Sequence, residues 1–128
     1  MAEKANEYGR AHAAEAEEKK RLIEKLMEPS GVSDQEALVR VANIVEGAIA
    51  NGFSEVMVYR FPNQLCTDRG RAISQSEPGW EETLKGMPAE IYGLWQRQLR
   101  PLGYKIRFEI VEWPRGMPGD VGITLRWG

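Results

Sequence analysis

The C-terminal stretch reads GYKIRFEIVEWPRGMPGDVGITLRWG from Gly103 to Gly128, and it decides the fold class. Apolar and polar residues alternate in two runs, at residues 104–113 and 120–127, which is the pattern of half-buried strands. The residues between the runs, Pro114–Asp120, are rich in Pro and Gly and favour a loop. The stretch therefore predicts a β-hairpin with a long loop.

Alternation also assigns a face to each side chain of the hairpin. We expect the apolar sets to face the helices and the charged sets to face water. A third strand, at residues 54–61, has a less regular pattern. If Met57, Tyr59 and Phe61 point inward there, Val56, Val58 and Arg60 join the open face. That open face would carry a mainly basic set of polar side chains: Arg60, Lys105, Arg107, Glu109, Thr124 and Arg126.

The N-terminal segment, residues 2–28, is rich in Ala, Glu and Lys, which are good helix formers. Pairs such as Glu17 with Arg21 sit at i,i+4 spacing. Apolar anchors appear only from Leu22 onward, so we expect a solvated helix that is frayed at its start and docked at its end. Residues 1–31 are thus predicted to be a charged helical extension, and residues 32–128 one sandwich domain.

A second helix is predicted from a capping box at Ser33–Glu36, followed by apolar residues at helical spacing up to Ile49. Further helical segments are expected between residues 78 and 100. They join the first strand to the strand at 104–113, so these two strands should run parallel and the last antiparallel. The prediction is an α+β, two-layer α/β sandwich with a three-stranded mixed sheet and helices on one face. The sequence leaves the place of the last strand open.

The amino-acid composition argues against several classes of function. The chain has 128 residues, a net charge of −2, one cysteine and one histidine, His12. One thiol cannot form an internal disulfide or a multi-cysteine zinc site, and a single histidine in a charged helix gives no catalytic triad. No apolar segment approaches a membrane span, and no signal peptide is evident. We expect a cytoplasmic protein that holds no metal or cofactor and does not associate with membranes. Its net charge also argues against nucleic acid as a partner.

The densest polar segment follows the first strand, at residues 63–71. Arg69 and Arg71 could hold an anion beside the start of a short helix capped by Thr67, and Cys66 could have a lowered pKa there. The simpler interpretation is a connector in which Asp68 pairs locally and Cys66 packs as a small apolar residue. The simpler interpretation is favoured.

The hairpin loop is the second candidate site. Two prolines and two glycines shape it, Arg115 lies near its tip, Asp120 lies at its base, and Trp113 beside it is expected to be partly exposed. The alternative is a loop shaped only for its own turn geometry. If the strands at 54–61 and 104–113 run parallel, this loop and the 63–71 segment share one end of the sheet.

Function remains open at this level. The leading prediction is a small binding or interaction module of unknown ligand that self-associates, with a homodimer as one form, and that has no catalytic role. One alternative is a small enzyme or binder for an anionic ligand, a phosphate or a carboxylate, with Cys66 as the weak nucleophile candidate. A second is a nucleic-acid-binding sandwich. The predicted ligand-binding residues are Arg60, Thr67, Asp68, Arg69, Arg71, Arg107, Arg115 and Asp120.

Overall fold

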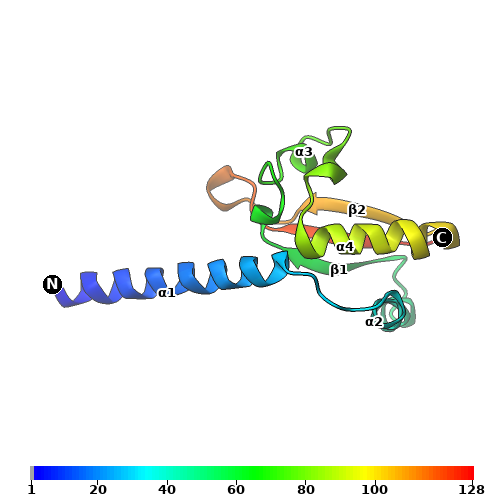
Figure 1. The fold of residues 1–128 in the computed structure, drawn as a ribbon, viewed down its shortest axis with the longest axis horizontal. Coiled ribbons are helices and arrows are strands. Elements are labelled where there is room, and N and C mark those ends of the chain that lie inside the picture. Colours follow the sequence, from blue (N-terminus) through cyan, green and yellow to red (C-terminus); the bar gives the residue numbers. More distant parts are fainter. Residues whose placement is uncertain (1) are drawn as a thin grey trace.

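A computed structural model describes the backbone of residues 2–128 and the side chains of residues 13–128. The main elements are α1 (Ala2–Met27), α2 (Asp34–Ala50), β1 (Glu55–Phe61), α3 (Arg71–Ser74), α4 (Gly86–Leu94), β2 (Lys105–Ile110) and β3 (Val121–Arg126). Short 3-10 turns lie at Asn63–Leu65, Trp80–Thr83, Arg100–Leu102 and Pro114–Gly116, and a π-helical turn extends α4 through Trp95–Leu99. Figure 1 shows α4 lying over the sheet, α2 beside β1, and α1 extending away from the body. The predicted α+β architecture is confirmed.

The sheet has the order β1–β3–β2, and both pairs of neighbours are antiparallel. Since β1 and β2 each run antiparallel to β3, they are parallel to one another, as expected from the helical connection. They share no hydrogen bonds, however, so the sheet is antiparallel rather than mixed. In this central place Val121–Leu125 are all buried, and the side chains of Met57 and Val111 lie close over Gly122, where a Cβ would collide with them.

A β-bulge in β1 changes the predicted faces of that strand. The register with β3 shifts between Met57, which lies opposite Thr124, and Tyr59, which lies opposite Ile123. A bulge adds one residue to a strand, so alternation is interrupted at that point. Met57 therefore points outward and is 45% exposed, while Val58 packs against the core. Tyr59, Phe61 and Arg60 take the expected sides, but the expected places of Met57, Val56 and Val58 are wrong.

The core lies between the sheet and α4. Phe61, Leu65, Val121 and Ile123 are almost fully buried, and Phe108 is buried beside them. The aromatic rings of Trp80, Tyr92 and Phe108 form a cluster, with centroids 4.9 Å apart for Trp80 and Phe108 and 6.2 Å apart for Tyr92 and Phe108. Such edge and tilted contacts add stabilisation beyond burial. The hairpin's apolar residues face the helices, as predicted from alternation.

In the part of α1 whose side chains the structure describes, the residues that pack against the core lie near its C-terminal end. Ile23 and Leu26 are half-buried against the core, whereas the described residues before them are exposed. Gly86 fixes this docking because a Cβ there would collide with the carbonyl oxygen of Leu26. The expected surface pair forms, with Arg21 Nη2 3.9 Å from Glu17 Oε2. Fraying of the first turns stays a prediction, and the side chain of His12 lies outside the described residues.

Helix α2 begins as the sequence predicts. Ser33 is its N-cap, and its Oγ accepts a hydrogen bond from the backbone N–H of Glu36 at 3.2 Å. Along its 17 residues only Val45 and Ala48 are buried. In the described part of the chain, none of the helices combines the length and the apolar character needed to cross a membrane.

Candidate functional site: a groove between two helices

Cys66 lies in the core. It is 2% exposed, and a backbone bridge pairs it with Leu84. Burial raises the pKa of the thiol from its usual 9.0 to about 11. At neutral pH the group is therefore an uncharged thiol, whereas nucleophilic cysteines need a lowered pKa and access to solvent. This geometry favours the packing interpretation of Cys66 over the nucleophile.

The remaining polar residues of the 66–71 segment shape a turn. The carboxylate of Asp68 accepts hydrogen bonds from the backbone N–H groups of Gly70, at 3.0 Å, and Ala72, at 2.9 Å. Asp68, not Thr67, thus caps α3, which has only four residues. Thr67, Arg69 and Arg71 have exposed side chains. The structure does not bring these side chains into a common pocket with Asp68.

Two of the predicted arginines of the open sheet face, Arg60 and Arg107, are paired with carboxylates. Arg60 donates from Nε to Asp120 Oδ2 at 2.9 Å and from Nη2 to Glu112 Oε2 at 2.8 Å. The hydrogen bond that Arg60 donates to Asp120 is the largest effect that raises the pKa of Arg60. Arg107 Nη2 lies 2.6 Å from Glu55 Oε2 and 3.5 Å from Glu109 Oε1. Arg60 and Arg107 therefore offer an incoming anion little unpaired charge, whereas Lys105 and Arg126 on the same face form no ion pair with the described side chains.

The two candidate loops do share one end of the sheet, as expected. Asn63 Nδ2 donates to the carbonyl oxygen of Pro118 at 2.7 Å. At the tip, Arg115 has a left-handed backbone (φ 54°) and an exposed side chain. Trp113 is 53% and Met117 66% exposed, so the loop presents apolar surface rather than a polar cleft.

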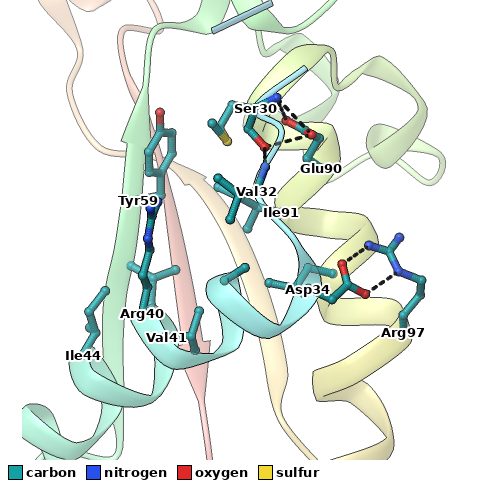
Figure 2. Close-up of a pocket in the computed structure, with 14 residues that line it drawn as sticks. Ser30, Val32, Asp34, Arg40, Val41, Ile44, Tyr59, Glu90, Ile91 and Arg97 are labelled. Carbon is teal, nitrogen blue, oxygen red and sulfur yellow. Dashed lines mark hydrogen bonds and ion pairs between the residues drawn. The ribbon is translucent and has the colours of Figure 1, made fainter. Parts of the chain in front are cut away.

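A cavity lies elsewhere, between two helices and the sheet. A groove of about 350 Å³ runs between α2 and α4, with β1 as its floor, and the segment at residues 30–34 lines it as well. Apolar side chains supply most of its surface: Val32, Val41, Ile44, Val58, Ile91 and Leu94. This volume falls at the lower end of the range of small-molecule sites, which are mostly apolar with a few polar groups. Figure 2 shows the residues that line it, from all four parts of the chain.

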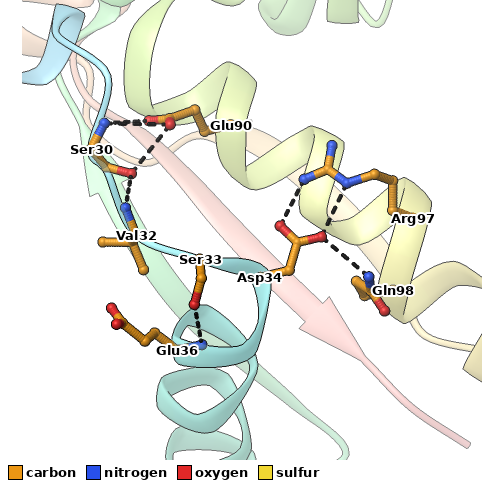
Figure 3. A network of polar contacts seen from close by, with 8 residues as sticks. All are labelled: Ser30, Val32, Ser33, Asp34, Glu36, Glu90, Arg97 and Gln98. Carbon is orange, nitrogen blue, oxygen red and sulfur yellow. Dashed lines mark hydrogen bonds and ion pairs between the residues drawn. The ribbon is translucent and has the colours of Figure 1, made fainter.

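Two polar contacts hold the walls of the groove together (Figure 3). At one end, the backbone N–H and the hydroxyl of Ser30 both donate to the carboxylate of Glu90 on α4, over 3.2–3.4 Å. At the other end, Asp34 accepts from Arg97 Nη2 at 3.0 Å and Nε at 3.2 Å, and from Gln98 at 3.1 Å. The hydrogen bond from Arg97 holds the pKa of Asp34 below its usual value.

Arg40 and Tyr59 line the same groove without such partners. Among the side chains of residues 13–128, neither the guanidinium of Arg40 nor the hydroxyl of Tyr59 makes a hydrogen bond or an ion pair. Partial burial raises the pKa of Tyr59, so its hydroxyl is neutral at physiological pH. Figure 2 shows both side chains on the wall formed by α2 and β1, across the groove from Glu90. They are the polar groups that a ligand would find free.

Sequence reasoning missed this site. The capping box and apolar stripe of α2 were evident, but a stripe at helical spacing predicts burial, not a groove. The available signal was an excess of apolar residues on α2, since Val41 and Ile44 line the groove while only Val45 and Ala48 are buried. No group of three or more potential metal ligands occurs in the described portion.

Comparison with known proteins gives no match: no family model fits the chain, and neither a curated protein nor a solved structure matches it.

Proposed function

We propose that this protein is a binding module without catalytic activity, and that the groove between α2 and α4 receives the apolar part of its ligand. The observation that carries the proposal is the groove's composition: an apolar floor, two polar contacts that close its ends, and two unpartnered polar groups on one wall. A buried apolar side chain normally has neighbours on all sides. Here Val41, Ile44 and Val58 face space that a ligand can fill, and filling it removes apolar surface from water.

Titration with the neutral dye Nile red, whose fluorescence rises in apolar surroundings, tests this proposal. Ala37→Phe places a bulky ring in the groove, because Ala37 lines it. Ala50→Phe is the matched control, since Ala50 is exposed on the same helix but is not part of the groove. We expect wild type and Ala50→Phe to bind the dye alike and Ala37→Phe to bind at least several-fold more weakly. Equal binding by the two variants, both folded by circular dichroism, would contradict the proposal.

Self-association is a second candidate, favoured by the outer side of α2. Val39, Ala42, Glu46 and Ile49 follow one another on α2 at intervals of three and four residues, as in a helix-pairing seam, and Phe53 lies just beyond the end of the helix. Val39 is 61%, Ile49 54% and Phe53 62% exposed. We propose that a second copy covers this stripe. Sedimentation velocity should detect a dimer that Ile49→Asp abolishes and Glu46→Leu strengthens; a wild-type monomer at high concentration would rule it out.

The other predictions stay open as lesser proposals. The module is proposed to act in the cytoplasm, on the grounds of its single buried thiol. An anionic ligand at Arg69 and Arg71 lacks a pocket in the described residues, and nucleic-acid binding has to contend with the pairing of Arg60 and Arg107. Retention of single-stranded RNA by the protein in a filter-binding assay at low salt would support the nucleic-acid hypothesis.

A further inference from the structure

The charged groups around the groove differ in how many ion pairs and hydrogen bonds they already make. Four line it: Asp34, Arg40, Glu90 and Arg97. Asp34 and Arg97 neutralise one another, and both oxygens of Glu90 accept hydrogen bonds from Ser30. Within the side chains described, from residue 13 onward, Arg40 alone of the four has neither an ion pair nor a hydrogen bond. Arg40 is therefore the cation of the groove that no described carboxylate pairs with, while Glu90 keeps a negative charge at the Ser30 end.

The position of Arg40 gives the groove a polarity. On α2 it lies one residue before Val41 and four before Ile44, both of which line the apolar surface. Glu90 lies across the groove, on α4, near Ser30 (Figure 2). An anionic group is attracted to the α2 wall and repelled from the Glu90 end. A guanidinium also matches the two oxygens of a carboxylate in a fork of parallel hydrogen bonds.

From this arrangement, and resting on the proposed function, we propose that the groove binds an aliphatic carboxylate, with the carboxylate on Arg40 and the hydrocarbon chain on Val41, Ile44 and Val58. Tyr59 also lines the groove, and its unpartnered hydroxyl is a second hydrogen-bond donor there. The binding is reversible and breaks no covalent bond. The proposed ligand class thus follows from the position of the Arg40 guanidinium beside the apolar side chains of the groove.

Three probes with the same eight-carbon chain separate the head group from the tail: octanoate, 1-octanol and octylamine. Isothermal titration calorimetry at pH 7.5 and low salt should give octanoate about tenfold tighter binding than 1-octanol, because the hydrogen bonds are charge-assisted. Octylamine should bind more weakly than either. Arg40→Gln should bring octanoate down to the level of 1-octanol and leave 1-octanol unchanged. Arg115→Gln, on the distant hairpin loop, is the matched control and should keep the preference for octanoate.

Each other outcome overturns a defined part of this account. Binding of 1-octanol and octanoate with equal strength would leave the groove as an apolar site and overturn the carboxylate proposal. Tighter binding of octylamine would also overturn it, because Glu90 would then be the group that meets the ligand. Failure of all three probes to bind would contradict the proposed function itself. Loss of the octanoate preference in Arg115→Gln as well as Arg40→Gln would show a nonspecific charge effect and overturn the role of Arg40.

Discussion

Helices α4 and α2 lie against the same sheet, but they bury very different shares of their apolar surface. In α4, Pro88 and Leu94 are buried, and Tyr92 packs on Phe108 and Trp80. In α2, which is nearly twice as long, burial is limited to Val45 and Ala48. A three-stranded sheet gives full cover to one helix across its centre, and the second helix lies beside the edge strand β1. The unused surface of α2 becomes the groove on one side and the exposed stripe on the other.

The contrast should appear first as a difference in stability. Phe108→Ala removes a ring that three aromatic side chains contact, so we expect about 3–5 kcal/mol less free energy of unfolding. Val45→Ala on α2 should cost only about 1–2 kcal/mol, because a smaller buried side chain is truncated and no aromatic contact is lost. Urea denaturation followed by tryptophan fluorescence measures both. Equal losses would contradict the unequal packing of the two helices.

Reactivity of Cys66 tests how tightly the α4 half of the molecule is closed. A pKa of about 11 in place of 9.0 leaves about a hundredfold less thiolate at pH 7.5, and burial adds a barrier to access. We expect Ellman's reagent to react at least about a hundredfold more slowly with the native protein than with the protein in urea. Rapid reaction of the native protein would show that this half opens readily, and it would return Cys66 to consideration as a nucleophile.

The junction between α1 and α4 is tested by Gly86→Ala. Gly86 has a left-handed backbone (φ 57°), and an added Cβ would lie 2.8 Å from the Cα of Met27. We expect a loss of about 1–2 kcal/mol in unfolding free energy from the backbone conformation alone, plus faster proteolysis after α1 as the helix is displaced. Gly47→Ala on α2 is the matched control. The added methyl group would point into open space in the interior of a helix. Gly47→Ala should therefore raise the free energy of unfolding by about 0.5–1 kcal/mol.

The smallest effect is expected at the ion pair that ties α2 to the helical segment after α4. Asp34→Asn weakens the contact with Arg97, whose side chain is more than half exposed, so the loss of stability should be slight. The pKa of Asp34 is lowered in the folded state, so its stabilisation is present above the usual value of 3.8 and is lost as pH falls through the lower folded value. The stability difference between wild type and Asp34→Asn should therefore shrink below about pH 4. A difference that grew on acidification would contradict this assignment.

Local patterns predicted most of the fold. Alternation at 104–110 and 121–126 placed Phe108 and Ile123 inside and Arg107 outside, and Ser33 marked the start of α2. Alternation could not place Met57 and Val58, because a bulge arises from pairing with β3 rather than from β1 alone. The central place of β3 also depends on which surfaces are buried, and no single segment carries that information.

The candidate site was harder to predict for the same reason. The groove exists because Ser30 meets Glu90 and Asp34 meets Arg97 across some sixty residues of sequence. Contacts at that separation leave no local pattern. Conversely, the conspicuous polar residues were locally satisfied: Asp68 caps a turn, and Arg60 pairs with Asp120. The segments richest in charged residues therefore contain side chains that already have partners within the fold.

The most direct test of the account is a map of where an apolar ligand touches the protein. Backbone amide chemical shifts of ¹⁵N-labelled protein, recorded during a titration with 1-octanol, give that map without relying on any variant. The account predicts that the shifts which change lie around the groove, at Val41, Ile44, Val58 and Ile91. Changes confined to the hairpin loop at Trp113 and Met117, with the groove unaffected, would contradict it.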